Sequence, residues 1–179
     1  MAKTKPGGLN FASQGVGSGG HVLGEMLKAA SGSPFTHVPY RGAGPAVTDL
    51  AAGSVDLLFD TYVSAIGQVQ AGKLRVIGWT DRNRSATLPD VPTMAETGFP
   101  SVELVVWHGI AAPLGTPPEI VKKLNEELVK AAQAPEVVQK VAAQGVEITT
   151  NGPEAFGKLV ADDHERLGKV IRDACIKMQ

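Results

Sequence analysis

Hydrophobic residues in the first half of the chain fall into short runs separated by stretches of helical spacing. Each run is bounded by Gly, Pro or Asp, which is typical of a buried strand. Strands and helices alternate, which predicts an α/β fold with a mainly parallel sheet and helices on both faces. The predicted strands are Leu9–Ser13, Phe35–Tyr40, Val55–Phe59 and Leu74–Thr80, and the predicted helices are Val22–Ala30, Val47–Ala51 and about Thr61–Ala71.

A polar, proline-rich stretch, Asp81–Pro100, follows these elements and has room for one short helix near Thr93–Thr97. Next comes a long extended run, Ser101–Ala112, which predicts a strand that crosses between two domains. We therefore expect an α/β lobe over residues 1–98, a crossing strand or hinge over 99–113 and a helix-rich part over 114–179.

The C-terminal part has apolar stripes at helical spacing but only one short strand among them. Helices with one apolar face need another element to cover that face. These faces therefore require a sheet that the C-terminal part does not supply. The expected elements are helices at about Pro118–Ala132, Glu136–Ala143 and Pro153–Ala174 and a strand at Val146–Thr149.

Composition narrows the possible partners of the 179-residue chain. Its 17 basic and 18 acidic residues leave a net charge of -1, so no global field attracts nucleic acid or an anionic membrane. The single cysteine, Cys175, cannot form an internal disulfide. The basic start is followed by Pro6–Gly8 where a secretory signal needs an apolar run, and no stretch is long enough for a membrane span.

The turn Gly15–Gly20 matches the dinucleotide pattern G-x-G-x-x-G between a strand and a helix. Such a site also needs an acidic residue after the next strand, where this chain has Tyr40 and Arg41. Arg41 suits a 2′-phosphate, so an NADP-dependent reductase stays open. The backbone amides at the start of the following helix equally favour a small anion, with Ser18 either donating to that anion or capping the helix.

Signatures of metal binding and hydrolysis are incomplete. His21 and Glu25 are four residues apart but lack the second histidine of a zinc motif. Val16 occupies the first glycine position of a nucleophile elbow around Ser18. We therefore expect no metal site and no hydrolase, and no enzyme activity or cofactor unless the reductase left open above is correct. His21 is either a ligand or a capping or core histidine. Asp60 either caps the next helix or points into a cleft.

Five segments in a specific order resemble the extracytoplasmic solute receptors of tripartite tricarboxylate transporters, also called the Bug family. The segments are Asn10–His21, His37–Gly42, Asp49–Asp60, Leu88–Thr93 and Ala112–Pro117. The resemblance implies the second lobe of a type II periplasmic-binding-protein-like fold plus C-terminal helices of an incomplete first lobe. Family receptors close two lobes over a small carboxylate and serve membrane transporter subunits in the periplasm.

Carried over by position, the resemblance places the ligand at the glycine-rich turn. Family members often have serines at Gly19–Gly20, so this chain loses hydroxyls there and keeps backbone donors. Because the resemblance begins partway into a family member, a lobe that binds nothing also stays open, and a natural start at Met1 would imply a cytoplasmic protein. The implied ligand-binding residues are Ser13, Gly17, Ser18, Gly19, Gly20, His21, Tyr40, Gly42, Asp60 and Thr61.

The missing first-lobe sheet leaves the C-terminal helices without cover and leaves a strand edge unpaired. Two copies of the chain can remedy both by pairing about a two-fold axis. We therefore predict a homodimer, or a higher even oligomer, whose interface is formed mainly by residues after Ser101.

Overall fold

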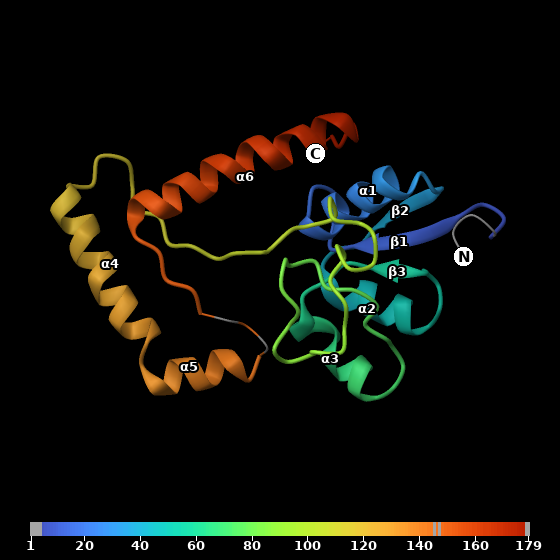
Figure 1. Ribbon diagram of the computed structural model, residues 1–179, viewed down its shortest axis with the longest axis horizontal. Coiled ribbons are helices and arrows are strands. Elements are labelled where there is room, and N and C mark those ends of the chain that lie inside the picture. The colour runs from blue at the N-terminus through green and yellow to red at the C-terminus, as the bar shows by residue number, and fades with distance from the viewer. Residues whose placement is uncertain (1–4, 145, 147, 178–179) are drawn as a thin grey trace. The chain divides into compact units, whose positions relative to one another are not determined.

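The computed structural model describes residues 5–144, 146 and 148–177. They divide into two compact units, one of residues 5–106 with 169–177 and one of residues 107–168 (Figure 1). The predicted division into lobes at residues 98 and 113 stays a prediction. Within the described residues, no helix combines the length and the apolar character that crossing a membrane requires.

The first unit is built on a parallel sheet of three strands. They are β1 (Leu9–Ser13), β2 (Phe35–Pro39) and β3 (Leu57–Leu58), in the order β2-β1-β3. In the central strand β1, Phe11 lies opposite His37 on one side and Leu57 on the other. The predicted α/β class with a parallel sheet is confirmed.

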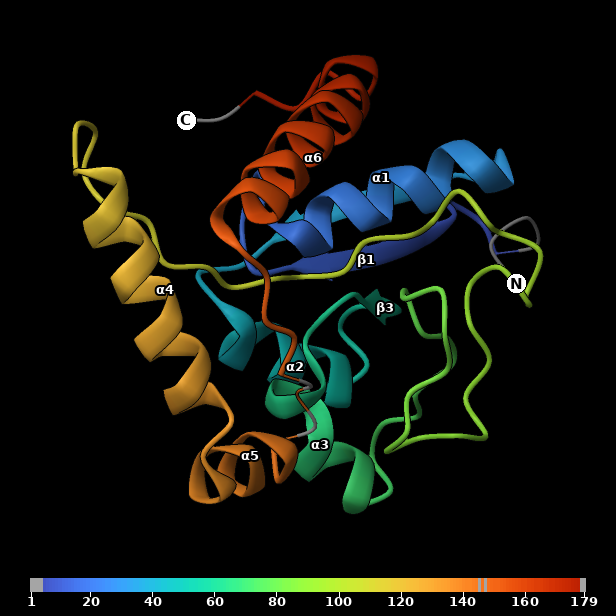
Figure 2. The ribbon, with the colours of Figure 1, turned by 60° about the vertical axis from the view of Figure 1, so that its left-hand side comes forward.

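Helices cover both faces of this sheet, α1 (Gly19–Ser31) on one and α2 (Ala43–Ala51) on the other, where α3 (Tyr62–Gln70) packs against α2 (Figure 2). Consecutive strand residues point to opposite faces. Phe11 accordingly packs on α1, where its ring fills the space beside Gly24. Its neighbour Ala12 is buried with Ala46 of α2 and Val55. The central strand therefore supplies the core of both layers.

The predicted strand Val55–Phe59 is shorter than expected, because only Leu57 and Leu58 form β3. At its start the Asp56 amide still donates to the Asn10 carbonyl at 3.0 Å, but side chains make the other hydrogen bonds at both ends. The Asn10 amide donates to Asp56 Oδ2 at 2.8 Å, and Gln14 Nε2 donates to the Phe59 carbonyl at 2.7 Å. Polar side chains thus end the strand earlier than its run of apolar residues indicates.

The predicted strand Leu74–Thr80 does not form, and Trp79 makes only an isolated parallel bridge with Thr93. The residue before Thr93 is Pro92, which has no amide proton to extend a ladder. The expected helix near Thr93–Thr97 is a turn. Thr93 and Glu96 close it reciprocally, because each backbone amide donates to the other's side chain, at 2.7 and 3.2 Å.

The run Ser101–Ala112 is also not a strand, although its first residues pack as one. Val102 and Leu104 are buried on alternate positions, and the Leu104 amide donates to the Thr80 carbonyl at 3.1 Å. The described residues offer no further strand for it to pair with. In the predicted strand Val146–Thr149, Glu147 lies outside the described residues, and Val146 and Ile148 belong to no strand.

The predicted C-terminal helices are confirmed as α4 (Pro118–Ala132), α5 (Pro135–Ala142) and α6 (Pro153–Asp173). None of the three contains a buried residue. The second unit is held locally, because Trp107 Nε1 donates to Asp163 at 2.7 Å and its ring meets Phe156 edge to face. Several large apolar side chains of this unit are exposed: Ile110, Leu114, Ile120, Leu124, Leu128, Val138, Val146 and Val160.

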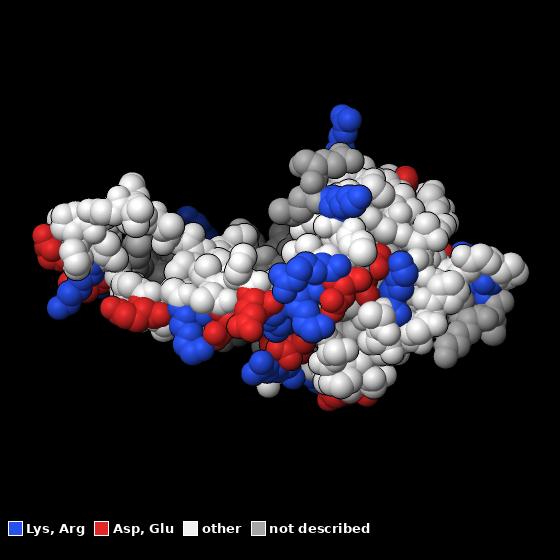
Figure 3. Space-filling model, turned by 90° about the horizontal axis from the view of Figure 1, so that it is seen from above, with Lys and Arg blue, Asp and Glu red and all other residues white. Residues whose placement is uncertain are grey.

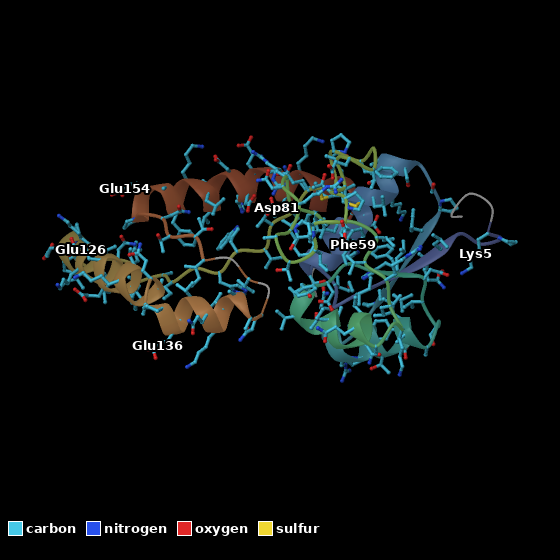
Figure 4. The ribbon with its side chains drawn as sticks, turned by 60° about the horizontal axis from the view of Figure 1, so that its bottom comes forward. Lys5, Phe59, Asp81, Glu126, Glu136 and Glu154 are labelled. Atoms are coloured by element: carbon cyan, nitrogen blue, oxygen red, sulfur yellow. The ribbon has the colours of Figure 1, made fainter. Side chains whose placement is uncertain are left out.

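Charged side chains lie on the outside of both units. Figure 4 shows the carboxylates of α4, α5 and α6 extending outward, for example Glu126, Glu136 and Glu154. Basic and acidic residues interleave on the face shown in Figure 3. Within α6, Lys158 pairs with Asp162 at 2.6 Å and Arg166 with Asp163 at 2.9 Å. That face therefore presents no broad field of one sign.

Candidate carboxylate site

The carboxyl ends of the three parallel strands meet at one edge of the sheet. The chain leaves β1 for α1 and β2 on one side, while β3 lies on the other side of β1. Ligands of open α/β sheets bind where neighbouring strands diverge in this way. The edge between β1 and β3, with the glycine-rich turn after Ser13, is therefore the candidate site.

Two glycines give the turn its shape. Gly15 and Gly17 have φ angles of 143° and 79°, in the region that residues with a side chain rarely adopt. The Ser18 amide donates back to the Gly15 carbonyl at 3.2 Å and closes the turn. Ser18 then caps α1, because its hydroxyl accepts the His21 amide at 3.3 Å. Of the two roles left open for Ser18, the geometry shows helix capping.

The amides of the turn divide into engaged and available donors. The Gly17 amide donates to His21 Nδ1 at 3.1 Å, and the amides of Ser18 and His21 bond within the turn. Among the described residues, the amides of Gly19 and Gly20 have no protein acceptor. They are the first two of α1, where the helix dipole favours an anion. Two adjacent donors are thus available to one carboxylate.

The two available glycines differ in their surroundings. A Cβ atom on Gly20 would stand 2.6 Å from both the Phe59 carbonyl oxygen and Gln14 Oε1. One on Gly19 would meet the side chains of Leu104 and Val106 at ordinary distances of 3.4 and 3.8 Å. Only a glycine at position 20 therefore lets the start of α1 approach the end of β3 this closely.

Asp60 follows β3 and is held by Gln14, whose Nε2 donates to Asp60 Oδ1 at 2.9 Å. The same oxygen accepts the Thr61 amide at 2.8 Å, and Oδ2 is buried without a partner among the described residues. The N-cap of α3 is Thr61, so Asp60 is not that cap. Thr61 is exposed, and its hydroxyl lies 3.1 Å from that of Ser64.

Tyr40 and Gly42 bring the end of β2 to the same edge. The Tyr40 amide donates to the Ser13 carbonyl at 3.0 Å, and the Gly42 amide donates to the Gln14 carbonyl at 3.1 Å. The Tyr40 hydroxyl donates to Asp49 Oδ2 at 2.7 Å, and this hydrogen bond raises the pKa of Tyr40. Tyr40 is therefore oriented by α2.

Ser13 is fully buried beneath the turn, and its hydroxyl has three polar neighbours. It donates to the Gly15 carbonyl at 2.9 Å, accepts the Gly15 amide at 3.2 Å and lies 2.7 Å from His37 Nε2. Burial, followed by the neighbouring His21, lowers the pKa of His37 to about 4. His21 is itself buried, and burial lowers its pKa as well.

The structure brings nine of the ten predicted site residues to the turn or the adjacent strand ends, and exposed Thr61 begins the next helix. Sequence reasoning missed Gln14, His37 and Asp49 as supporting residues. The signal for His37 was its place in β2 opposite Phe11, on the face that α1 covers. No sequence pattern predicted that the Gln14 side chain bonds to the end of β3.

The same strand ends offer less to a dinucleotide or a metal ion than to a carboxylate. The end of β2 presents Tyr40 bonded to Asp49, with Arg41 exposed, where a dinucleotide site would hold a ribose with a carboxylate. Within the part of the chain that the structure describes, no three His, Cys, Asp or Glu side chains gather as metal ligands would.

Comparison with known proteins places the chain among transport receptors. The family described as tripartite tricarboxylate transporter family receptor matches residues 1–176. Protein BugT of Bordetella pertussis is 34% identical over 179 residues, which is 100% of this chain and 55% of BugT. The chain spans about half the length of most of the curated relatives it matches.

Two solved structures are similar in fold and sequence. One is described as R. palustris Rpa4515 with adipate, with a TM-score of 0.86 and 32% identity over 98% of this chain and 58% of that one. Another is MatC (Rpa3494) from Rhodopseudomonas palustris with bound malate, with a TM-score of 0.76 and 31% identity over 91% and 56%. The periplasmic-binding-protein-like fold is thereby confirmed.

The matched region includes every segment on which the resemblance rested, from Asn10 to Pro117. The chain therefore belongs to the family of tripartite tricarboxylate transporter receptors.

Proposed function

We propose that this chain is the carboxylate-binding part of a solute receptor, and that one carboxylate of its ligand accepts hydrogen bonds from the Gly19 and Gly20 amides. The observation that carries the proposal is that these two adjacent donors at the start of α1 have no acceptor among the described residues. Backbone donors of this kind hold an anion without a cationic side chain. The function is binding, with no catalysis and no cofactor.

The remaining predicted residues divide into three groups in this proposal. Ser13 and Gly17 shape the turn, because their polar groups are already hydrogen-bonded within it. Tyr40, Gly42 and Asp60 line the adjacent strand ends. The predicted contacts of Ser18, His21 and Thr61 with the ligand belong to the same proposal.

Relatives support a small organic acid as the ligand. The structure of Rpa4515 is described with adipate and that of MatC with malate, both dicarboxylates. Two carboxylates on one short chain suit a receptor in which the turn binds one end. We extend this class of ligand, and not an individual acid, to the present chain.

The whole receptor, of which the chain spans about half by comparison with its relatives, would work outside the cytoplasmic membrane. Membership of the family implies a periplasmic location and delivery of the solute to membrane transporter subunits. Both are proposals for the full-length protein.

The chain by itself is proposed to form a homodimer or a higher even oligomer through residues after Ser101. Support comes from the second unit, in which Leu124 and Leu128 of α4 are 50% and 40% exposed. Ile110 and Leu114 are 73% and 107% exposed. Each large apolar side chain moved from water into an interface contributes about 1.5–3 kcal/mol.

Calorimetric titration with adipate, malate, a tricarboxylate and NADP at pH 7.5 tests the proposed function. We expect binding of at least one carboxylate and none of NADP. Gly20→Ala should weaken carboxylate binding about tenfold or more, because its Cβ displaces the start of α1 from Phe59. Gly19→Ala is the matched variant, since it adds the same atom with ordinary contacts and keeps the amide.

Each result of the titration assigns a different function. Binding of NADP without any carboxylate would support the reductase. Heat from neither class of ligand would mean that the folded chain binds nothing. Equal losses in the two glycine variants would contradict the assignment of the turn.

A further inference from the structure

Two histidine rings stack next to the glycine-rich turn. His21, in the first turn of α1, and His37, in β2, have ring centroids 3.7 Å apart and planes inclined by 12°. The Phe11 ring stacks on His37, with the two ring centroids 5.0 Å apart. Packing from α1, β1 and β2 thus fixes both imidazoles.

Each ring is hydrogen-bonded to a different residue, His21 to Gly17 in the turn and His37 to Ser13 at the end of β1. His21 Nδ1 accepts the Gly17 amide at 3.1 Å. His37 Nε2 lies 2.7 Å from the Ser13 hydroxyl, which in turn bonds to both polar groups of the Gly15 backbone. The pair therefore holds the turn at two points, one on each side of Val16.

These bonds define the protonation of the rings. An N–H group donates only to a nitrogen with a free lone pair, so His21 Nδ1 is unprotonated when it accepts the Gly17 amide. The Ser13 hydroxyl donates its hydrogen bond to the Gly15 carbonyl. His37 Nε2 must then carry a hydrogen and donate to Ser13 Oγ. The observed turn requires a neutral His21.

The surroundings of His21 and His37 disfavour protonation of their rings. Burial lowers the pKa of both rings, and each positive ring repels the other at this distance. The charged groups that act on them are on α1: Glu25 raises the pKa of His21, and Lys28 lowers the pKa of both rings. Glu25 and Lys28 are 3.3 Å apart, so their fields partly offset one another.

We propose that His21 and His37 are positioning residues for the carboxylate site: the neutral stacked pair holds the turn so that the Gly19 and Gly20 amides face the ligand, and protonation of the pair releases both turn and ligand. The inference rests on the function proposed above. Protonated Nδ1 of His21 is a donor that faces the Gly17 donor, so the bond between them breaks and the turn opens.

Nuclear magnetic resonance of the ligand-free chain tests the pair directly. Between pH 7.5 and pH 5, the Gly17 amide and the His21 ring nitrogens should change with one common midpoint. The Gly115 amide, in a turn of the second unit, should stay constant. A proton on His21 Nδ1 at pH 7.5, or a Gly17 amide that is indifferent to the titration of His21, would overturn the proposal.

Binding of adipate and malate, used as probes, supplies a second readout. In His21→Asn the amide oxygen stands near the place of Nδ1, and in His37→Gln the amide nitrogen stands near the place of Nε2, so the double variant keeps the bonds but does not titrate. Wild-type Kd should rise about tenfold per pH unit below the midpoint, beyond the effect of ligand ionisation. The double variant should lose this extra dependence.

Two further variants complete the test. His21→Ala removes the acceptor of the Gly17 amide and should weaken binding about tenfold at pH 7.5. His164→Gln is the matched control, because His164 is exposed on α6, and it should keep the wild-type profile. A wild-type pH profile in the double variant would contradict the proposal, whatever its affinity.

Failure of the proposed function is distinguishable from failure of this inference. If the wild-type chain binds neither acid at pH 7.5, the carboxylate function is contradicted, and the ligand-free spectra still decide whether the pair holds the turn. If the double variant does not fold, His37→Gln alone and the wild-type spectra give the same decision.

Discussion

The Gln14 side chain joins the carboxyl end of β1 to that of β3, with its Nε2 2.9 Å from Asp60 Oδ1 and 2.7 Å from the Phe59 carbonyl oxygen. This pair of bonds closes the edge of the sheet at which the candidate site lies. Without it, the Phe59 carbonyl would lose the Gln14 donor, and the Asp60 carboxylate, whose Oδ2 is already buried without a partner among the described residues, would keep only the Thr61 amide.

Gln14→Ala should therefore lower the free energy of unfolding by about 1–3 kcal/mol, the cost of leaving partly buried acceptors unpaired. The measurement is urea unfolding followed by circular dichroism. Gln133→Ala, at an exposed C-cap of α4, is the control and should stay within about 0.5 kcal/mol of wild type. Equal stabilities of the two variants would contradict the bridging role of Gln14.

Gly17→Val should abolish carboxylate binding, because a β-branched residue does not adopt the φ angle of 79° on which the turn depends. Ser18→Ala should have a smaller effect, about 1 kcal/mol in binding, since it removes one cap and leaves the backbone donors. Calorimetry with adipate and malate measures both. Stronger loss in Ser18→Ala than in Gly17→Val would show that the side chain, and not the backbone, holds the ligand.

Stability should fall as the pH drops from 6.5 towards 5. The pKa values of His21 and His37 are lowered in the folded chain, chiefly by burial, so the unfolded chain binds more protons in this interval. The pKa of Asp56 is lowered by Lys5, and that of Glu96 by Arg84, so these two groups act only below about pH 4.5.

Urea midpoints at pH 7.5, 6 and 5 measure this dependence. His37→Gln should reduce the decline, and His164→Gln should leave it unchanged. A midpoint that rises on acidification would have the wrong sign and would contradict the assignment of neutral, buried histidines.

Light scattering coupled to size exclusion tests assembly at micromolar concentration. The wild-type chain should elute as a dimer or a higher even oligomer, and Leu124→Lys with Leu128→Lys should shift it towards the monomer by placing charge on the apolar face of α4. Glu126→Gln, on an outward side chain of the same helix, is the control. A stable wild-type monomer of 18.6 kDa would contradict the proposed oligomer.

The sequence predicted those helices and strands that are determined by residues within or next to them. α1 follows from the capping Ser18, the apolar stripe after it and the stop at Gly32, and the structure has all three. The C-terminal helices follow likewise from their spacing. Elements that depend on distant partners were less predictable, since β3 is shortened by Asn10 and Gln14 and the segment Leu74–Thr80 meets Pro92.

The site was predictable to a similar extent. Glycine spacing and family resemblance indicated the turn, and the resemblance placed Ser13 and Gly17 near the ligand, which stays a prediction. Tertiary contacts show that their polar groups are bonded to His37 and His21. Such bonds join β1 to β2 and the turn to α1, and no linear pattern contains them.

Chemical shifts of the Gly19 and Gly20 amides during titration with adipate and malate at pH 7.5 test the central claim most directly. With an acid that binds, both amide protons should move downfield together and saturate with the calorimetric Kd, as expected for donors that gain a charged acceptor. Saturable binding of a carboxylate that leaves these two amides unmoved, and shifts another segment instead, would contradict the site.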